Sequence, residues 1–511
     1  MGAFTPLDVV VLVAYLVGVT VFGVWWGGRQ KDASDYFLAG QGLPWWAICL
    51  SIVATETSAL TFISVPATAY GSDFWMLQLT FGYLIGRVVI AAVLLPGYFR
   101  GRLNTAYALL EERFGLVTRR FASVIFMVTR ALGDSVRVFA AAIPLALITG
   151  MPYWQAILLT GIFTLVYTYF GGLRAVVWVD VAQMVLYVVG GVAALAVLSK
   201  VVPGGWAAIV ETARSADKLS VVKFEGSFAD PTWLVTGLVG GAFLSMASHG
   251  VDHLIVQRLL AAASLGEARK ALITSGVLVI GQFALFLVVG MALFAHYGGV
   301  PFDPADEVFP RFIVEGLPPG VSGLIIAAVF AAAMSTVSSS LNSLASASTH
   351  DLYAPLSSRA DDPEHMLRVG RRFTLLWAAI LIGGAILFRF VSEGTPIVVV
   401  ALQVASFTYG GLLGGFLLGV VSKRAAQRDA IVGMGVAMTI LTVLWATQQF
   451  EIIPKMVDTL WFALIGSVIT VVVGSLSARL RGAPIQPPSG GDDGERADGR
   501  VAAGGDSAAT I

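Results

Sequence analysis

The sequence predicts an all-α, polytopic membrane protein that crosses the bilayer about thirteen times. Of its 511 residues, 57% are hydrophobic and 13% are charged, and the mean hydropathy is +0.82. These values lie well outside the range of soluble domains. The apolar residues gather in runs of membrane-spanning length, and two of these runs are interrupted by polar groups. Composition, run length and interruptions together define the fold class.

The charge balance and the single cysteine exclude several classes of protein. Basic and acidic residues number 32 each, so the chain has no excess of positive charge that would indicate a nucleic-acid partner. Cys49 lies within an apolar run, so we expect neither a disulfide framework nor a cysteine metal site. Residues 8–26 are preceded by no basic segment and followed by no small-residue cleavage site, so we interpret them as a first span and not as a signal peptide.

The predicted spans follow from the length of about 20 apolar residues that a helix needs to cross a bilayer. They are 8–26, 45–66, 75–99, 121–149, 153–170, 176–200, 233–257, 271–296, 321–348, 373–391, 396–421, 430–448 and 457–477. We expect a first helix and inner loop at 1–44, five-helix repeats at 45–200 and 233–422, an extracellular loop at 201–232, two further helices at 423–481 and a disordered cytoplasmic tail at 482–511.

The distribution of basic residues predicts the orientation. An odd number of spans places the two termini on opposite sides of the membrane. Most of the 32 lysines and arginines fall in the loops on one side, among them Arg29, Arg119 and Arg424. Because basic loops stay in the cytoplasm, we expect a multi-pass protein of the cell (inner) membrane with its N-terminus outside and its C-terminus inside.

Two spans carry interruptions of the kind that mark a transporter's binding site. The second span contains A54-T-E-T-S58, followed by Pro66. The seventh contains S245-M-A-S-H-G250, followed by Asp252 and His253. These interruptions lie five spans apart, so we expect two five-helix repeats of inverted topology, each beginning with a broken helix.

The ninth span is apolar and yet rich in hydroxyl groups. Inside a bilayer such groups must be satisfied internally and tend to mark an ion or substrate path. Hydroxyl and carbonyl oxygens suit a small hard cation. The alternative is a helix-packing seam in which the hydroxyls bond back to carbonyls. The polar residues are Ser335, Thr336, Ser338, Ser339, Ser340, Asn342 and Ser343.

Four stretches in this order resemble the sodium:solute symporter family, which includes sodium–galactose, sodium–proline and sodium–sialic acid symporters. They are S34-D-Y-F-L-A-G-Q41, Y169-F-G-G-L-R-A-V-V-W-V-D-V-A-Q183, Q257-R-L-L-A-A-A-S-L-G-E-A-R269, and the serine-rich run ending N342-S and H350-D-L-Y353. The resemblance covers nearly all of residues 8–480. It implies a LeuT-like fold of inverted repeats, a transporter and not an enzyme, and Na⁺ as the coupling ion.

The resemblance also implies two sodium sites. The family's first site joins carbonyls of the broken second span to the serine-rich span, and the matching positions are Ala54, Thr57, Ala332, Ser335 and Thr336. The sialic acid relatives hold a second sodium on positions that correspond to Asp180, Ser338 and Ser339. The alternative for Asp180 is a cap or an ion pair with Arg174.

The substrate is expected between the two breaks. Ser58 and Thr61 match substrate-contacting hydroxyls of the sialic acid relatives. Glu56 is an intramembrane carboxylate that needs a partner. Ser248 stands where the galactose symporters carry an aromatic residue, which argues against a plain hexose pocket. All candidates for substrate binding are Glu56, Ser58, Thr61, Gln78, Arg130, Asp134, Arg137, Ser245, Ser248, His249 and Gln403.

Several of these candidates have an alternative role. Arg130, Asp134 and Arg137 share one helix face, and a buried guanidinium needs a partner. Either one arginine receives a substrate carboxylate while Asp134 neutralises the other, or the three form an internal network. Gln78 and Gln403 can equally make interhelical hydrogen bonds.

The sequence thus predicts sodium-coupled uptake of a small organic solute, with a carboxylate of the sialic acid, monocarboxylate or amino acid type. A proton-coupled carrier using Glu56, Asp134 or His249 is one alternative, and a carrier of a neutral sugar or polyol is another. A transporter-like sensor is disfavoured by the short tail after Leu480. A metal on His249 and His253 lacks a third ligand. We expect a monomeric transport unit in a lipid bilayer.

Overall fold

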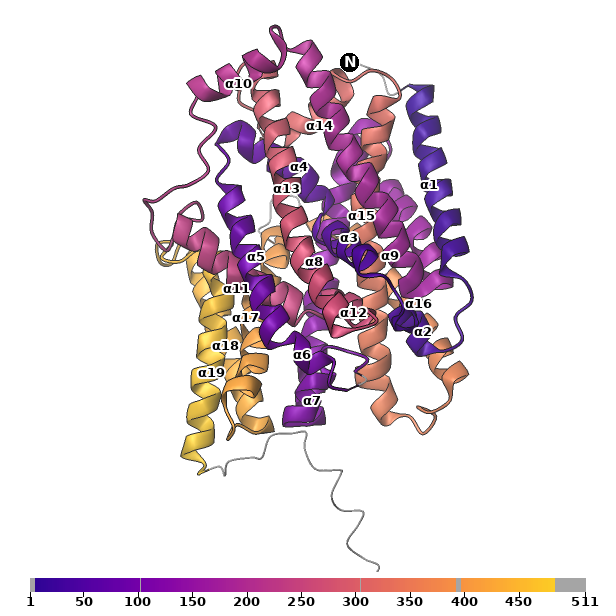
Figure 1. Ribbon diagram of the computed structural model, residues 1–511, viewed down its shortest axis with the longest axis vertical. Helices are drawn as coiled ribbons and strands as arrows, with labels where there is room; N and C mark the ends of the chain where they lie inside the picture. The colour runs from indigo at the N-terminus through magenta and orange to yellow at the C-terminus, as the bar shows by residue number, and fades with distance from the viewer. Residues whose placement is uncertain (1–4, 102, 304, 392–396, 483–511) are drawn as a thin grey trace, which may run out of the picture.

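The computed structural model describes residues 5–101, 103–303, 305–391 and 397–482, and these residues form a helical bundle (Figure 1). Within the described ranges the one β pairing is an isolated bridge between Leu43 and Ala262. The predicted tail beyond residue 482 lies outside the described residues. The helices are α1 (Pro6–Gly27), α2 (Ala33–Leu38), α3 (Trp45–Glu56), α4 (Ala59–Gly71), α5 (Met76–Val93), α6 (Leu95–Tyr98), α7 (Ala108–Phe114), α8 (Leu116–Thr149), α9 (Tyr153–Val201), α10 (Gly205–Ser215), α11 (Gly241–Gly250), α12 (His253–Leu260), α13 (Leu265–Tyr297), α14 (Val308–Glu315), α15 (Val321–Ala347), α16 (Pro363–Val391), α17 (Ile397–Val421), α18 (Gln427–Gln449) and α19 (Phe462–Leu480), with short turns η1 (Ala39–Gln41), η2 (Thr236–Gly240), η3 (Ala305–Glu307), η4 (Ser348–Tyr353), η5 (Ala354–Leu356) and η6 (Thr459–Trp461).

Each predicted span overlaps at least one helix of the described residues, and two predicted spans share α9. Within α9 the backbone leaves the helical region at Gly172, with φ 57° and ψ −154°. Glycine is required there, because a Cβ atom would lie 2.4 Å from the carbonyl oxygen of Tyr36. By length and composition, eight described helices can cross a membrane, or nine when α3 and α4 form one broken span. The larger number of spans stays a prediction.

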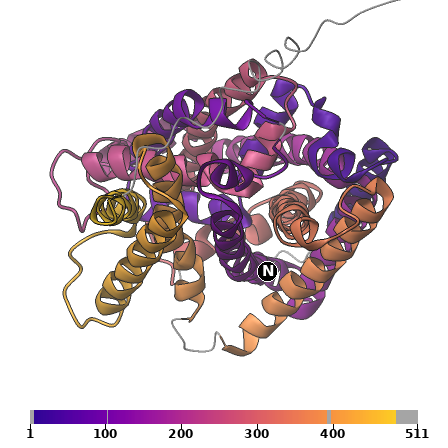
Figure 2. The same cartoon turned by 90° about the horizontal axis from the view of Figure 1, so that it is seen from below.

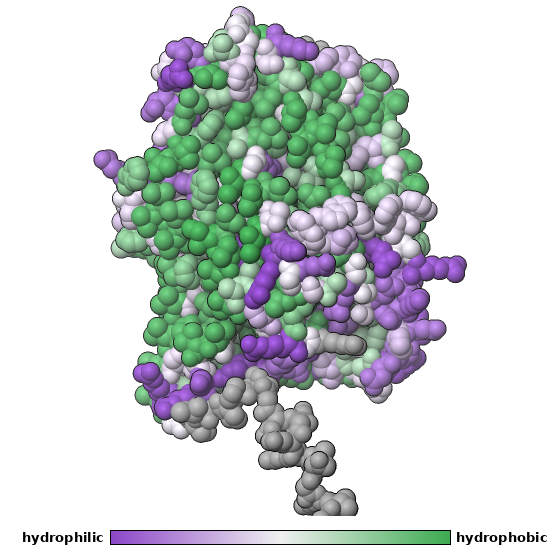
Figure 3. Space-filling view, viewed as in Figure 1, coloured by the Kyte–Doolittle hydropathy of each residue, from purple (hydrophilic) through white to green (hydrophobic). Residues whose placement is uncertain are grey.

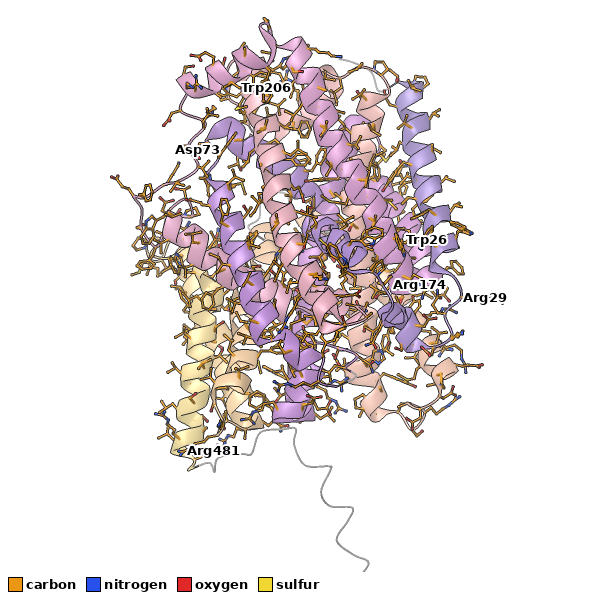
Figure 4. All side chains as sticks on the ribbon, in the orientation of Figure 1. Trp26, Arg29, Asp73, Arg174, Trp206 and Arg481 are labelled. Carbon is orange, nitrogen blue, oxygen red and sulfur yellow. The ribbon has the colours of Figure 1, made fainter. Side chains whose placement is uncertain are left out.

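The surface agrees with a multi-pass membrane protein. Hydrophobic side chains cover most of the visible face between two more polar ends (Figure 3). Trp206 and Asp73 lie in the upper part of the molecule, Arg481 lies at the lower end, and Arg29 lies between them, a little below the middle (Figure 4). Trp206 and Asp73, which are predicted to be outside, are therefore separated along the long axis from Arg481, which is predicted to be inside.

Both predicted helix breaks are present. Helix α3 ends at Glu56, the chain is extended at Thr57 and Ser58, and α4 begins at Ala59. The axes of the two pieces differ by 63°. In the second half, α11 ends at Gly250, and Asp252 then caps α12 by accepting a hydrogen bond from the amide of Leu254 at 2.9 Å. Both breaks therefore fall in the spans where the sequence predicts them, the second and the seventh.

The serine-rich helix α15 lies at the centre of the bundle. Every residue from Ile325 to Ala347 is buried. Helix α15 packs against α9, α8, α1 and α16 and also contacts α3. The last helices, α18 and α19, pack on α17 at one edge of the bundle (Figure 2). The hydroxyls of α15 therefore face protein on all sides.

Candidate functional site

At the break between α3 and α4, backbone carbonyls and backbone amides lack their helical hydrogen-bond partners. The last carbonyls of α3, from Ala54 onward, lose their helical donors because the chain is extended at Thr57 and Ser58. The first amides of α4 lose their helical acceptors in the same way. Carbonyls at a helix C-terminus carry partial negative charge, and amides at an N-terminus carry partial positive charge. The break can face a cation on one side and an anion on the other.

A small cavity lies beside this break. Ala54 and Thr57 line it from the broken helix, and Ala332 and Ser335 line it from α15. The volume of the cavity, measured as the space open to the centre of a water-sized sphere, is about 10 Å³. This is roughly enough for one water molecule or small ion. Four of the five residues predicted for the first sodium site therefore meet. The fifth, Thr336, donates its hydroxyl to the carbonyl of Ala332 at 3.2 Å. The other residues around the cavity are Gln183, Met184, Tyr187 and Ala331.

The residues predicted for a second sodium site also meet, but an arginine lies among them. The Asp180 carboxylate is fully buried and accepts hydrogen bonds from Ser51 at 2.6 Å and Ser335 at 2.7 Å. Arg258, on α12, donates to the same carboxylate at 3.1 Å and also to the Ser339 hydroxyl. One guanidinium therefore contacts two of the three predicted second-site residues.

The ion pair of Asp180 differs from the alternative that the sequence suggested. Arg174 lies 3.9 Å from Asp35, and its side chain is 44% exposed. The alternative in which Asp180 pairs with Arg174 is therefore not found, and the ion-pair partner of Asp180 is Arg258. The third second-site residue, Ser338, donates to the carbonyl of Ser335 at 3.1 Å.

Arg130 is held in a closed network that connects α8 with the second break. Its Nε atom donates to Asp252 at 3.0 Å, and its Nη2 atom donates to the same carboxylate and to the Tyr409 hydroxyl at 3.0 Å. A weaker contact of 3.4 Å reaches Asp134. Asp252 is buried, so Arg130 is the charge that neutralises it.

Arg137 is less enclosed than Arg130. Its Nη1 atom donates to Asp134 at 2.8 Å, and its side chain is 33% exposed, against 10% for Arg130. Asp134 is fully buried and also accepts a hydrogen bond from the Ser340 hydroxyl. The predicted Arg130–Asp134–Arg137 face therefore exists, and within it Arg137 is the arginine with accessible surface.

Glu56 finds its partner in Arg87. The Arg87 guanidinium, on α5, pairs with the Glu56 carboxylate and donates to the Ser275 hydroxyl at 2.6 Å. Nε2 of His249, on α11, lies 3.6 Å from the same carboxylate. This cluster connects the first break with α5, α11 and α13. Glu56 keeps 20% of its side chain exposed, while Arg87 is fully buried.

The remaining candidates take local roles. Ser58 and Thr61 form a reciprocal cap at the start of α4, with contacts of 3.4 Å between each hydroxyl and the other residue's amide. Ser245 donates to the carbonyl of Tyr83 at 3.0 Å, and Ser248 contacts Nδ1 of its neighbour His249 at 2.8 Å.

The two remaining glutamine candidates are Gln78 and Gln403. The Gln78 carboxamide donates to the carbonyl of Thr232 and accepts from the amide of Lys223 at 3.4 Å, so it fastens the segment between α10 and α11. The side chain of Gln403 lies outside the described residues. His253 contacts the Ser346 hydroxyl at 3.1 Å and so belongs to a different cluster from His249.

Sequence reasoning missed the residues that neutralise the buried carboxylates. Arg258 was visible within the Q257-R motif, but nothing local paired it with Asp180. Asp252 and Tyr409 were not expected to bind Arg130. These contacts join segments far apart in the sequence, so only the fold brings them together.

Two broken helices and a small cavity between one break and a hydroxyl-rich central helix define a secondary transporter. The sequence model of the sodium:solute symporter family matches residues 36–437. The chain belongs to this family, so it is a sodium-coupled transporter of a small solute and not an enzyme.

Similar proteins within this family include sialic acid and monocarboxylate carriers. The sodium/sialic acid symporter NanT of Aliivibrio fischeri is 33% identical, over 93% of this chain and 94% of its own. Sodium-coupled monocarboxylate transporter 1 of Xenopus laevis is 28% identical, over 85% of this chain and 71% of its own. A solved structure of a Na⁺-coupled sialic acid symporter, in a substrate-bound outward-open state, has a TM-score of 0.84 at 30% identity and covers 93% of this chain and 98% of its own.

Proposed function

We propose that this protein uses the sodium gradient to take up a small solute bearing a carboxylate. The observation that carries the proposal is the break at Thr57 and Ser58, where open carbonyls and open amides meet. Filling the carbonyl side with Na⁺ fixes the angle between α3 and α4, and this angle positions the amides for the solute. Each ligand therefore favours the conformation that binds the other.

The carboxylate is assigned to the N-terminus of α4 and to Arg137. The amides of the first turn of α4 attract an anion. Arg137 has accessible surface and can donate a bidentate pair of hydrogen bonds. Similar proteins are named for sialic acid and for monocarboxylates, both of which carry a carboxylate. We place Glu56, Ser58, Thr61 and His249 around the rest of the solute.

Two sodium sites are assigned as the sequence predicts. The first uses oxygens of Ala54, Thr57, Ala332, Ser335 and Thr336, and its support is the cavity that four of them line. The second uses Asp180, Ser338 and Ser339, and its support is the buried carboxylate beside α15. The second site requires the Arg258 guanidinium to move away from Asp180.

One chain contains both breaks and both sides of the cavity, so we assign transport to the monomer. We place the N-terminus outside the cell membrane and the C-terminus in the cytoplasm, because most basic loops then face inward. Proton coupling through Glu56 is less well supported, since its carboxylate is paired with the fully buried Arg87.

The test is thermal stability of the detergent-purified protein with sialic acids, monocarboxylates, amino acids and neutral sugars, each in sodium and in potassium. A solute at 100 times its Kd stabilises the folded state by about 2.7 kcal/mol. We expect a carboxylate to raise the melting temperature in sodium and to have little effect in potassium. Equal shifts in the two salts contradict coupling, and a shift with neutral sugars alone contradicts the carboxylate assignment.

A further inference from the structure

Three residues of α9 line the cavity, and two of them, Gln183 and Tyr187, carry polar groups beside the apolar Met184. Gln183 and Tyr187 lie four residues apart on this helix, so they share one face, and both line the cavity opposite Ala332 and Ser335. Gln183 is 2% exposed. The three α9 residues are separate from the five positions that the family resemblance assigns to the first sodium site.

Within the part of the chain that the structure describes, the Gln183 side chain makes one hydrogen bond through its amide nitrogen and none through its carbonyl oxygen. Its amide nitrogen donates to the hydroxyl of Tyr15, on α1, at 3.2 Å. Its Oε1 atom is buried and has no hydrogen-bond partner among the described residues. A buried acceptor of this kind normally finds a partner, such as an ion or an ordered water. Gln183 itself lines the cavity beside the first break.

A second glutamine near the cavity repeats this arrangement. Gln282, on α13, donates its amide nitrogen to the hydroxyl of Thr57, and its own Oε1 atom is buried without a partner in the described part of the chain. The Thr57 hydroxyl thereby accepts one hydrogen bond, and the Thr57 carbonyl follows the end of α3, where it has no helical donor. Two glutamine side chains whose carbonyl oxygens are unpartnered within the described ranges therefore lie at the cavity or contact a residue that lines it.

We infer that Gln183 Oε1 is an additional ligand of the coupling sodium ion at the first site, contributed by α9. This inference rests on the proposed function of the same site. Sodium is a hard cation that takes oxygen ligands from proteins, a carboxamide oxygen can be one of them, and the cavity admits about one small ion. Asp180 lies about one turn earlier on α9 and accepts a hydrogen bond from Ser335, which also lines the cavity.

The test compares Gln183→Met with Tyr15→Phe. Methionine keeps the length of the side chain and removes the carbonyl oxygen. Phenylalanine at position 15 removes the group that holds the Gln183 amide but leaves its oxygen in place. The readout is the sodium concentration that gives half of the sodium-dependent rise in melting temperature of the purified protein without solute.

We expect Gln183→Met to raise this concentration at least tenfold and Tyr15→Phe to change it less than threefold. Equal effects of the two variants would show that Gln183 only ties α9 to α1, and an unchanged value for Gln183→Met would also overturn the inference. If Gln183→Met does not fold, Gln183→Asn takes its place, because it withdraws the oxygen but keeps a carboxamide, and the same two outcomes apply.

Ser335→Ala separates this inference from the proposed function. If Ser335→Ala raises the sodium requirement and Gln183→Met does not, the first sodium site stands and the additional ligand is wrong. If neither variant changes the sodium requirement, both assignments fail.

Discussion

Arg130 and Arg137 lie on one face of α8, and the structure predicts opposite consequences of removing them. Arg137→Ala leaves Asp134 with the Ser340 hydroxyl and the 3.4 Å contact to Arg130. Arg130→Ala leaves the buried Asp252 carboxylate with the Tyr409 hydroxyl and its helix-cap amide, but without a charged partner. The first change is expected to affect solute binding, and the second to affect folding.

The magnitudes follow from these contacts. A hydrogen bond to a charged group contributes about 1.5–3 kcal/mol, so loss of one carboxylate contact at Arg137 weakens solute binding by about 10–150-fold. Removal of one partner from a buried ion pair costs about 3–5 kcal/mol. Arg130→Ala is therefore expected to destabilise the protein by that amount, before any effect on the solute.

The assay measures two quantities on each purified variant in saturating sodium: the melting temperature without solute, and the solute concentration for half of the ligand-induced shift. Arg174→Ala is the control, since this arginine is 44% exposed and its nearest carboxylate is 3.9 Å away. We expect Arg137→Ala to lower the melting temperature less than Arg130→Ala does, because Asp134 keeps the Ser340 hydroxyl and the contact to Arg130, and to lose affinity. If Arg137→Ala melts as early as Arg130→Ala, the two arginines act as one structural network and our reasoning is refuted.

Three further predictions concern sodium. Ser335→Ala removes a ligand of the first site and should raise the sodium concentration for half-maximal uptake; an unchanged value contradicts that site. Ser338→Ala combined with Ser339→Ala should lower the Hill coefficient for sodium in transport assays, and the second site is wrong if the coefficient stays the same. Arg258→Met leaves Asp180 without its cation, so the melting temperature should fall in potassium and recover in sodium. A loss of stability that is equal in both salts argues against sodium at Asp180.

The helix breaks and the serine-rich helix could be predicted because their signals are local. An unpaired hydroxyl is costly in a bilayer wherever its neighbours lie, so the serines of 335–343 indicate a site without knowledge of the fold. The sequence A54-T-E-T-S58 likewise interrupts an apolar run whatever packs against it. The structure confirms both features.

The ion pairs could not be predicted in the same way, because each depends on which helices become neighbours. Arg174 lies near Asp180 in the sequence and was the obvious partner. The chain leaves the helical conformation at Gly172, however, and Arg174 points toward Asp35. The true partner, Arg258, comes from α12, after the second break. A sodium-binding role for Gln183 could not be predicted from the sequence, because a single glutamine within a span forms no recognisable motif. What distinguishes Gln183 in the described part of the structure is its unpartnered carbonyl oxygen and its place in the lining of the cavity.

The position of Arg258 explains how the two breaks can communicate. Arg258 lies on α12, the helix that follows the second break. Its guanidinium donates hydrogen bonds to Ser51 on α3, Asp180 on α9 and Ser339 on α15. These three helices also surround the cavity beside the first break. A buried charge must remain paired, so any movement of α12 that withdraws Arg258 leaves Asp180 in need of another cation. Sodium is the cation that the proposed function supplies, and its entry at Asp180 therefore links ion binding to the position of α12.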